Sequence, residues 1–478
     1  MSAVTSDGHV PLREKLSYGL ADFGNCLYWQ FFKYYLLYFY TDIFRIAPKE
    51  NAAAVAGTMF LIVRLWDAVF DTVVGVIADR THSRWGKFRP YLLFGAVPFG
   101  LAGIITFTTP NFDATGKIIY AYVTYTFLMM VYSAVAIPQN SLLGVITPNP
   151  SERTSLSRYK FVFAFSAGLV VQFFTPRLVK WFGHGDAAHG YQMALVCYAT
   201  IAVFLFFYCF AVVRERVKPP AGQQTRLKDD FRDLLGNGPW MVLFAVTLTT
   251  ILSYAFRTGT LIHYYKYYVG NHEIDTVFWG VRHFEYEELF SWSLVLGSVL
   301  TIVGTAFVPY FTRRFGKRTM YAGLMGISNV AVLAYYFLPP SSVGWIVGLQ
   351  LAISATQGPT SAILWAMYAD CADYSEWKNK RRATGLVFSA AVTSQKFGWS
   401  LGGAIPGWML SHFGYIADTA LSPKTLNGIL LTVSIMPAIA GFIATGLTLF
   451  YRLNEKRVGE ISHELAERHA AELQPALS

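Results

Sequence analysis

Long apolar stretches recur along the whole chain, and they restrict it to structures that can cross a lipid bilayer. Stretches such as AYVTYTFLMMVYSAVAI and GILLTVSIMPAIAGFIATGLTLF approach or exceed the ~20 residues that span a bilayer core. Only 14% of the 478 residues are charged, whereas soluble domains carry roughly 25%. Charged and Gly/Pro-rich breaks divide the chain into about twelve such stretches. We therefore expect an all-α integral membrane protein.

The distribution of basic residues predicts the orientation of these spans. A net charge of +10 would also suit a nucleic-acid-binding protein, but the Lys and Arg residues gather in alternate loops and the loops between them are poor in both. This asymmetry is typical of cytoplasmic loops. It predicts an even number of spans with both termini in the cytoplasm and no nucleic-acid partner. The N-terminal stretch MSAVTSDGHVPLREK has neither the n-region nor the h-region of a signal peptide, so we expect the first span to be retained. The basic loops carry Arg80, Arg84, Lys87 and Arg89; Arg153, Arg158 and Lys160; Arg214, Arg216 and Lys218; Arg313, Arg314, Lys317 and Arg318; and Lys378, Lys380, Arg381 and Arg382.

A long basic loop near the middle divides the chain into two similar parts. Each part has a short loop of the form basic–aromatic–Gly–Lys–basic, RWGKFRP in the first and RRFGKR in the second. Matching loops at matching places indicate an internal duplication, which is common among secondary transporters. We expect a six-helix half at 1–213, a cytoplasmic loop at 214–238, a second half at 239–451 and a cytoplasmic tail at 452–478.

Two further features complete the layout. The tail is polar and helix-prone, with a weak apolar stripe from Ile461 and Leu465, so we expect a solvated helix rather than a partner site. The four cysteines fall within or at the ends of spans and are interpreted as small apolar residues. They are Cys26, Cys197, Cys209 and Cys371.

Three ionisable residues stand inside one apolar stretch, RLWDAVFDTVVG. Asp67 and Asp71 are four residues apart and share one helix face, which Arg64 joins. Each such group costs at least ~2.5–3.5 kcal/mol in a lone span, so it normally faces the protein interior or a cavity. Two carboxylates one turn apart need a positive partner. The pattern favours a bound Na⁺ or Li⁺ or a shared proton over an ion pair with Arg64.

The first span carries a mixed polar stripe. Asp22, Cys26, Trp29 and Lys33 follow spacings of 4, 3 and 4 and form one helix face. Such a face suits a cavity for a hydroxylated ligand, with Trp29 available to stack on a sugar ring. The alternative is that Asp22 and Lys33 lie near opposite membrane interfaces, where long side chains reach water easily.

Other polar groups occur within later spans. Pro138, Gln139 and Asn140 lie in or at the end of the fourth span, where amides can bind hydroxyls. His263 lies near a span end and is interpreted as a satisfied interfacial histidine, with a proton relay as the alternative. Lys396 is deeper than His263 and has no partner nearby in the sequence, so it ranks higher as a functional residue. Arg257 is a further candidate ligand residue. No P-loop, metalloprotease motif or nucleophile elbow is present in the sequence, which argues against ATP-driven transport and against an enzyme.

Several of these segments resemble one known family. RLWDAVFDTVVGVIADRTHSRWGKFRPYLLFG, SERTSLSRYKFVFA and ADCADYSEWKNKRRATGLVFSAAVTSQKFGWSLGG are similar to the glycoside–pentoside–hexuronide:cation symporters of the major facilitator superfamily, over nearly the whole chain and in order. The resemblance implies two six-helix halves with about twelve membrane helices. It also implies that Asp67 and Asp71 ligate a coupling cation, with Ser133 as a hydroxyl contributor, and that Lys396 lies near both ligands.

The sequence also departs from this family. At the positions of Cys26 and Ala136 the family's α-galactoside transporter has aspartates, and at Asn140 it has a tryptophan, so an α-galactoside substrate is not expected. Phe70 replaces an asparagine of the cation motif, which leaves H⁺ and Na⁺ open. Lys33 places a positive charge on the proposed cavity face and, with Arg257 and Lys396, could neutralise a hexuronide. A neutral glycoside or pentoside is equally compatible.

We therefore predict a symporter that imports a sugar with H⁺ or Na⁺ by alternating access, with no other cofactor, as a monomer in a bacterial-type inner membrane. The alternatives are a transporter of an amphiphilic, lipid-like solute and a non-transporting sugar sensor. The expected cation-binding residues are Asp67, Asp71 and Ser133. The expected substrate-binding residues are Asp22, Asn25, Cys26, Trp29, Lys33, Gln139, Asn140, Arg257 and Lys396. The expected gating residues are Asp79, Arg84, Lys87, Arg89, Asp370 and Asp373.

Overall fold

The fold is known from a computed structural model. It describes residues 9–48, 50–147, 149–216, 236–276, 280–379 and 384–473. The centre of the long basic loop and the cluster at 380–383 lie outside the described residues, so their predicted cytoplasmic location is not addressed by the structure.

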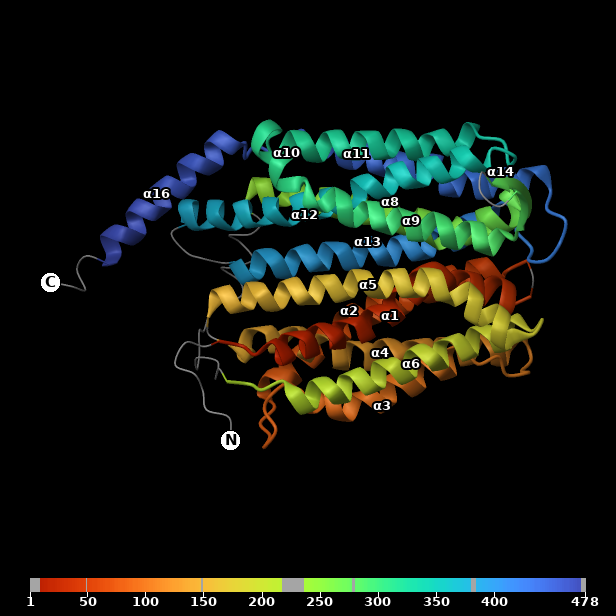
Figure 1. Ribbon diagram of the computed structural model, residues 1–478, viewed down its shortest axis with the longest axis horizontal. Helices are drawn as coiled ribbons and strands as arrows, with labels where there is room; N and C mark the ends of the chain where they lie inside the picture. Colours follow the sequence, from red (N-terminus) through yellow and green to blue (C-terminus); the bar gives the residue numbers. More distant parts are fainter. Residues whose placement is uncertain are drawn as a thin grey trace. The chain divides into compact units, whose positions relative to one another are not determined.

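The first half of the chain is helical throughout, and its helices run along a common direction (Figure 1). Aspartates cap two of them, because Asp113 accepts from the Gly116 N–H and Asp186 from the Ala188 and His189 N–H groups. The elements are α1 (Leu12–Tyr38), the π-helical turn η1 (Phe39–Ile43), α2 (Ala52–Arg80), α3 (Arg89–Thr106), α4 (Ala114–Ile146), α5 (Pro150–Gly183) and α6 (Ala187–Val212).

The second half is also mainly helical but contains one small hairpin that the sequence analysis did not predict. Its strands β1 (His272–Thr276) and β2 (Gly280–Phe284) are antiparallel, with His272 opposite Phe284. The helices are α8 (Gly238–His263), η2 (Tyr264–Val269), α9 (Tyr286–Ala306), α10 (Val308–Phe315), α11 (Lys317–Ala334), η3 (Tyr335–Phe337), α12 (Val343–Asn379), α13 (Thr384–His412), α14 (Pro423–Val433), α15 (Ile435–Thr448) and α16 (Glu455–Leu473).

The described part contains eight helical segments that are long and apolar enough to cross a membrane. They include α3 to α6, α9, α8 with η2, α11 with η3, and α14 with α15. Helices α1, α2, α12 and α13 have 27 to 37 residues and are long enough as well, but they carry more polar and ionisable side chains. Together these segments agree with the prediction of about twelve membrane helices.

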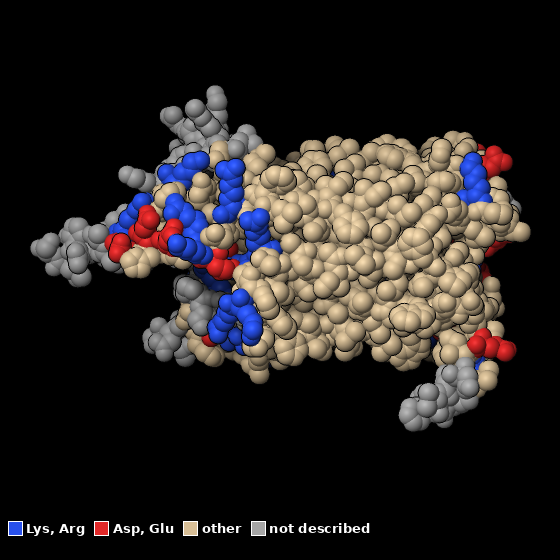
Figure 2. Space-filling view, turned by 90° about the horizontal axis from the view of Figure 1, so that it is seen from above, with Lys and Arg blue, Asp and Glu red and all other residues tan. Residues whose placement is uncertain are grey.

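One face of the protein carries few charged side chains between its two ends (Figure 2). On the face shown in Figure 2, Lys and Arg gather at one end, and the flank carries almost no charged side chain. Large apolar side chains such as Phe94, Phe204 and Trp345 are exposed on the surface of the protein instead of being buried. This surface is suited to lipid rather than water.

The helices form two compact units that do not follow the two sequence halves. The first unit contains Met1–Ala221, Thr258–Val295 and Gly403–Ile429, and the second contains Gly222–Arg257, Leu296–Gly402 and Leu430–Ser478. In the first unit, α1 packs closely on α6. A Cβ atom added to Gly24 would lie only 3.2 Å from the Ala202 backbone, so the glycine allows this close approach. Aromatic rings of α1, such as Tyr28 and Phe31, fill the adjoining core. This packing fixes the face of α1 that carries Asp22.

The prediction of a solvated tail is wrong for one face of α16. Ile461 and Leu465 are only 2% and 8% exposed and belong to the core of the second unit, with Tyr451 and Cys371. Trp377 at the end of α12 donates its indole N–H to Glu464 at 2.6 Å. The weak stripe in the sequence is therefore sufficient to dock the helix, because its two apolar residues are i and i+4 on one face.

Candidate cation and sugar site

Asp67 is buried on α2 and is joined to α4 by a hydrogen bond. Asp67 is only 4% exposed, and the Ser133 hydroxyl donates a hydrogen bond to Asp67 Oδ1 at 2.8 Å. Asp71 lies one turn further along α2 and is half-buried. The structure thus brings together the carboxylate predicted from the helix spacing and the hydroxyl predicted from the family resemblance. The three side chains present oxygen atoms, which hard monovalent cations prefer.

Arg64 also lies in this region, packed against aromatic rings. Its guanidinium is 4.9 Å from the centre of the Trp29 ring, and Tyr125 is a further neighbour. Trp29 in turn faces Tyr132, at 6.3 Å between ring centres. The cation–π contact covers one face of the indole, so a sugar ring could stack only on the other face.

The Asp22 end of the α1 stripe contains a lysine that the sequence analysis assigned to a loop. Lys160 Nζ lies 3.8 Å from Asp22 Oδ1 and donates to Asn140 Oδ1. The loop assignment of Arg153, Arg158 and Lys160 is wrong, because α5 starts at Pro150 and includes all three. Asp22 is 7% exposed, so it does not reach water at a membrane interface. The resulting pair of opposite charges lies beside an amide from a third helix.

Amide groups of α1 and α4 meet next to this pair. Asn25 donates to the Gln139 side-chain oxygen, and the Cys26 thiol lies 3.8 Å from Asp22. Within the described residues, Asn25 Oδ1 and Gln139 Nε2 are buried and have no hydrogen-bond partner. One acceptor and one donor are therefore left in the protein interior, where a hydroxyl group can satisfy both. Further along α1, Lys33 lies over the Tyr34 ring at 4.8 Å.

The candidate residues of the second half lie in the second unit or at its boundary. Arg257 is 6% exposed and packs over the Tyr335 ring at 4.6 Å. Its Nε and Nη2 atoms have no hydrogen-bond partner among the described residues. Lys396 is half-buried on α13, and its carbonyl accepts from the Ser400 hydroxyl. The expected proximity of Lys396 to the cation and sugar sites stays a prediction, as does a contact of Arg257 with the sugar.

The inner loop RWGKFRP is held by an acid that the sequence analysis did not single out. Gly86 adopts φ +114°, a conformation that favours glycine. The Glu215 carboxylate accepts from the Lys87, Phe88 and Arg89 N–H groups at 2.7, 2.7 and 2.9 Å. It therefore satisfies the free donors at the start of α3.

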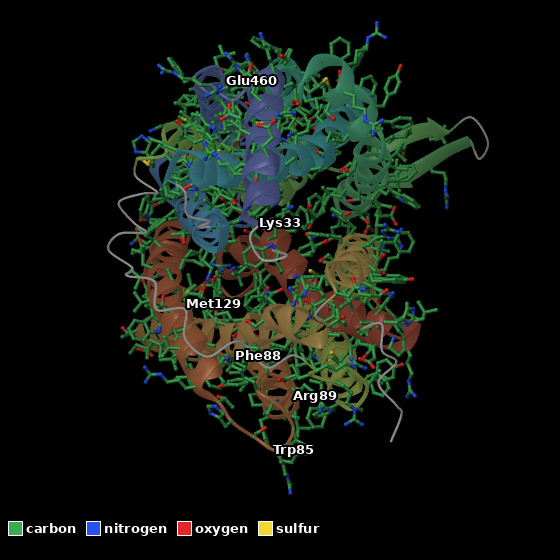
Figure 3. The ribbon with its side chains drawn as sticks, turned by 90° about the vertical axis from the view of Figure 1, so that its left-hand side faces the viewer. Lys33, Trp85, Phe88, Arg89, Met129 and Glu460 are labelled. Carbon is green, nitrogen blue, oxygen red and sulfur yellow. The ribbon has the colours of Figure 1, made fainter. Side chains whose placement is uncertain are left out.

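The predicted gating cations of this loop differ in their environments. Arg89 is buried and donates to the Trp85 and Phe210 carbonyls, whereas Arg84 is exposed and lies over Trp85. Figure 3 shows Trp85 at the tip of the loop, with Arg89 on the side of the helices. Arg89 thus stabilises the loop within its own half. The Asp79 side chain lies outside the described residues.

The second half repeats this arrangement. Gly316 has φ +79°, and Glu455 accepts from the Lys317 N–H at 2.8 Å. Lys317 Nζ also contacts both oxygens of Asp370 at 2.7 Å, so this predicted gating residue is an ion-pair partner. Asp373 lies half-buried on the same helix. Glu455 thus accepts from a backbone N–H of the second loop as Glu215 does in the first.

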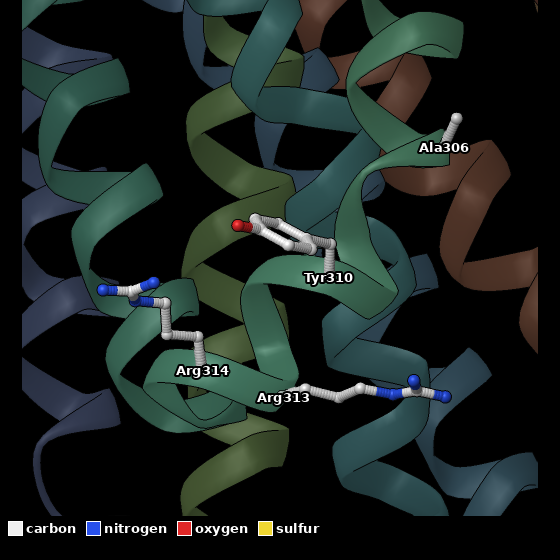
Figure 4. Close-up of a pocket in the computed structure, with 4 residues that line it drawn as sticks. All are labelled: Ala306, Tyr310, Arg313 and Arg314. Carbon is white, nitrogen blue, oxygen red and sulfur yellow. The ribbon is translucent and has the colours of Figure 1, made fainter.

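A hollow of about 630 Å³ lies at the turn between α9 and α10, lined by Ala306, Tyr310, Arg313 and Arg314 (Figure 4). It is a surface feature next to the second inner loop. None of the predicted ligand residues lines it.

Comparison with known proteins decides the family. Residues 17–455 match the protein family described as "MFS/sugar transport protein". The chain belongs to this family. Its relatives include a putative glycoside/cation symporter of Escherichia coli K12, 33% identical with 96% of each chain covered. Another is the isoprimeverose transporter of Lactiplantibacillus pentosus, 33% identical over 98% of this chain and 95% of that one. These relatives confirm the resemblance to the glycoside–pentoside–hexuronide:cation symporters.

Solved structures agree on the fold. A D-xylose–proton symporter superposes with a TM-score of 0.59, covering 91% of this chain and 97% of that one at 12% identity. At this identity the likeness shows the major facilitator fold alone. The chain is therefore a multi-pass membrane symporter of a sugar-transporting family and not an enzyme.

Proposed function

We propose that the protein couples uptake of a neutral glycoside or pentoside to one cation bound at Asp67, Asp71 and Ser133. The observation that carries this proposal is the hydrogen bond from Ser133 to the buried Asp67 carboxylate. A buried carboxylate is costly without a positive partner. A bound cation or proton supplies that partner, and its binding lowers the repulsion between the two carboxylates.

The preference for a neutral sugar comes from the first unit. Asp22 and Lys160 form a pair of opposite charge, and Asn25 and Gln139 leave one acceptor and one donor free within the described residues. Sugar hydroxyls donate and accept hydrogen bonds at the same time, so they match such a surface. A uronate carboxylate would add an unmatched negative charge beside Asp22 and Lys160, whose charges already balance. The relatives named for a glycoside and for isoprimeverose are consistent with this choice.

The basic loops support a topology with both termini in the cytoplasm. In the transport cycle, the cation binds first and reduces the cost of ordering the sugar site. The two sequence halves then exchange access from one side of the membrane to the other.

Flux measurements in proteoliposomes test this function. Neutral glycosides, pentosides and uronides are each offered under an imposed H⁺ or Na⁺ gradient. We expect uphill accumulation of a neutral sugar driven by one of the two gradients. Accumulation of uronides alone would refute the neutral class, and gradient-independent equilibration of every sugar would refute coupling.

A further inference from the structure

A second buried carboxylate, Asp42, lies in the first unit at the opposite end of α1 from the amino terminus. Helix α1 has 27 residues and is therefore about 40 Å long, so η1 lies across the membrane from Leu12. Asp42 is only 3% exposed. Its oxygens contact the Tyr267, Tyr415 and Thr41 hydroxyls at 2.6, 2.7 and 2.7 Å, Lys266 Nζ at 2.9 Å and His263 Nε2 at 3.3 Å.

Lys266 extends this group into an alternating chain of charges. Its ammonium also contacts Asp418 at 2.8 Å, and Asp418 in turn contacts Arg45 at 2.5 Å. Two carboxylates are thus matched by two cations. We call these residues and the hydroxyls around Asp42 the Asp42 cluster. It joins η1 of the first sequence half to η2 and to the α13–α14 loop of the second half.

The position of the hydrogen on His263 follows from its neighbours. Asp42 can only accept hydrogen bonds, and the Thr41 hydroxyl already donates to Asp42 or to the Leu37 carbonyl. His263 Nε2, at 3.1 Å from Thr41 Oγ1 and 3.3 Å from Asp42 Oδ2, must therefore carry the hydrogen. Within the described residues, Nδ1 is buried and has no hydrogen-bond partner.

A second proton on this ring would disturb the cluster. His263 is fully buried between the Tyr38 and Tyr415 rings. Protonation would place an N–H donor at Nδ1 without an acceptor, and would add one positive charge to a group that is balanced. Both effects disfavour the assembled cluster. Separation of the segments would bring the ring to water and relieve both.

Other titratable groups adjoin the cluster from α9. The Tyr286 hydroxyl lies 3.4 Å from that of Tyr38 and donates to Glu287 at 3.0 Å. Burial opposes ionisation of Asp418, but Lys266 and Arg45 outweigh it and hold the pKa of this loop carboxyl below its usual range. Asp418 therefore stays ionised near neutral pH. Glu287 is the acid that needs a separate control.

We propose that the Asp42 cluster is the outer gate of this symporter and that His263 binds the proton that opens it. This inference rests on the proposed topology, which places η1 outside the cell. A proton taken up by His263 from the outside therefore releases the gate. The site is distinct from Asp67 and Asp71, and its proton sets the access of the carrier rather than the coupling ion.

Pulsed electron paramagnetic resonance of the full chain tests the gate without sugar. Spin labels are placed at Thr109 and Ala420, two exposed positions on the α3–α4 and α13–α14 loops. The native cysteines are replaced first, and transport by that background is verified. We expect the population of molecules with separated labels, relative to the population with close labels, to rise about tenfold from about pH 7.5 to about pH 5.5. This is a typical size for coupling between two sites.

The variants separate the proton sensor from the gate. H263Q keeps an N–H donor toward Asp42 and should stay closed at both pH values. D42N removes the acceptor of five contacts, so the two labelled loops should be separated at both pH values. Lys180 and Glu285 form an exposed pair at 2.8 Å at the same end, so K180Q is the control and should respond to pH as the wild type does.

Four results would overturn the proposal. The first is a wild-type distance distribution that does not change with pH, and the second is an H263Q response to pH equal to that of the wild type. The third is a D42N distance distribution equal to that of the closed wild type. The fourth is loss of the pH response in E287Q instead of in H263Q. Because no sugar is present, failure here is distinguishable from failure of the proposed sugar coupling.

Discussion

Ser133 on α4 donates a 2.8 Å hydrogen bond to the buried carboxylate of Asp67 on α2. This contact joins two helices at the point where the chain places two acids inside an apolar span. It gives Asp67 a neutral oxygen neighbour, and in the proposed function this hydroxyl and the carboxylates of Asp67 and Asp71 are the ligands of the coupling cation.

The first prediction concerns this hydroxyl. S133A should weaken activation of transport by the coupling cation by roughly tenfold or more, the usual cost of a lost hydrogen bond to a charged group. S141A is the matched control, because Ser141 lies on the same helix and donates to the Ile137 carbonyl of that helix. The measurement is transport rate against cation concentration. Equal behaviour of the two variants would exclude Ser133 from the site.

The second prediction concerns Lys160. K160Q leaves the buried Asp22 without its positive partner and should weaken sugar binding about 30-fold or more, as expected for breaking a desolvated charge pair. K160R should retain most of the affinity. Lys15 and Glu152 join the same two helices at 2.9 Å, so K15Q is the control. Wild-type affinity in K160Q would remove Lys160 from the substrate site.

The third prediction concerns the inner loop. R89Q should lower the free energy of unfolding by about 1–3 kcal/mol, because the buried guanidinium donates to the Trp85 and Phe210 carbonyls. The exposed Arg84 should matter less, and R84Q should stay within about 0.5 kcal/mol of the wild type. Thermal unfolding in detergent measures both. An equal loss of unfolding free energy in R89Q and R84Q would show that the burial of Arg89 does not stabilise the loop.

The fourth prediction concerns the tail. Deletion of residues 452–478 removes Glu455 and uncovers the surface beneath Ile461 and Leu465, so the melting temperature should fall. Accumulation of sugar should persist in the protein that remains folded, because the proposed ligand residues lie elsewhere. Uptake per folded molecule is the measurement. Complete loss of uptake would favour a function that depends on the tail, as in a sensor.

The fifth prediction concerns substrate charge. K33Q should weaken binding of a uronide by roughly two orders of magnitude if the protein binds one and Lys33 contacts its carboxylate. Binding of the matching neutral glycoside should change far less. Titrations of both sugars against wild type and variant give the comparison. An equal loss for both would mean that Lys33 supports the fold.

The sequence predicts features that depend on neighbours along one helix. The spacing of Asp67 and Asp71 is a local property, as is the stripe that starts at Asp22, and both were recognised from periodicity. Contacts between helices are different. Lys160 was assigned to a loop because it follows Arg153 and Arg158, and nothing local indicates that α5 packs it beside Asp22. Likewise, the carboxylate of Glu215 reaches the α3 N-terminus only through the packing of α6.

The Asp42 cluster shows the same limit more strongly. Asp42 is followed closely by Arg45 and lies at the end of an aromatic span, where a solvated interfacial acid is the ordinary expectation. His263 was interpreted as an interfacial histidine for the same reason. Their contact depends on helices from different halves meeting at one end, and single-sequence periodicity carries no information on that meeting.

In the proposed function, Asp67 holds the cation that drives sugar uptake. The most direct test of this role is sugar accumulation by wild type and D67N in proteoliposomes under an imposed cation gradient, with sugar exchange measured in parallel. We expect the wild type to accumulate sugar uphill, and D67N to lose accumulation while retaining part of the exchange, because the cation and sugar sites are distinct but coupled. Full concentrative uptake by D67N would contradict the account.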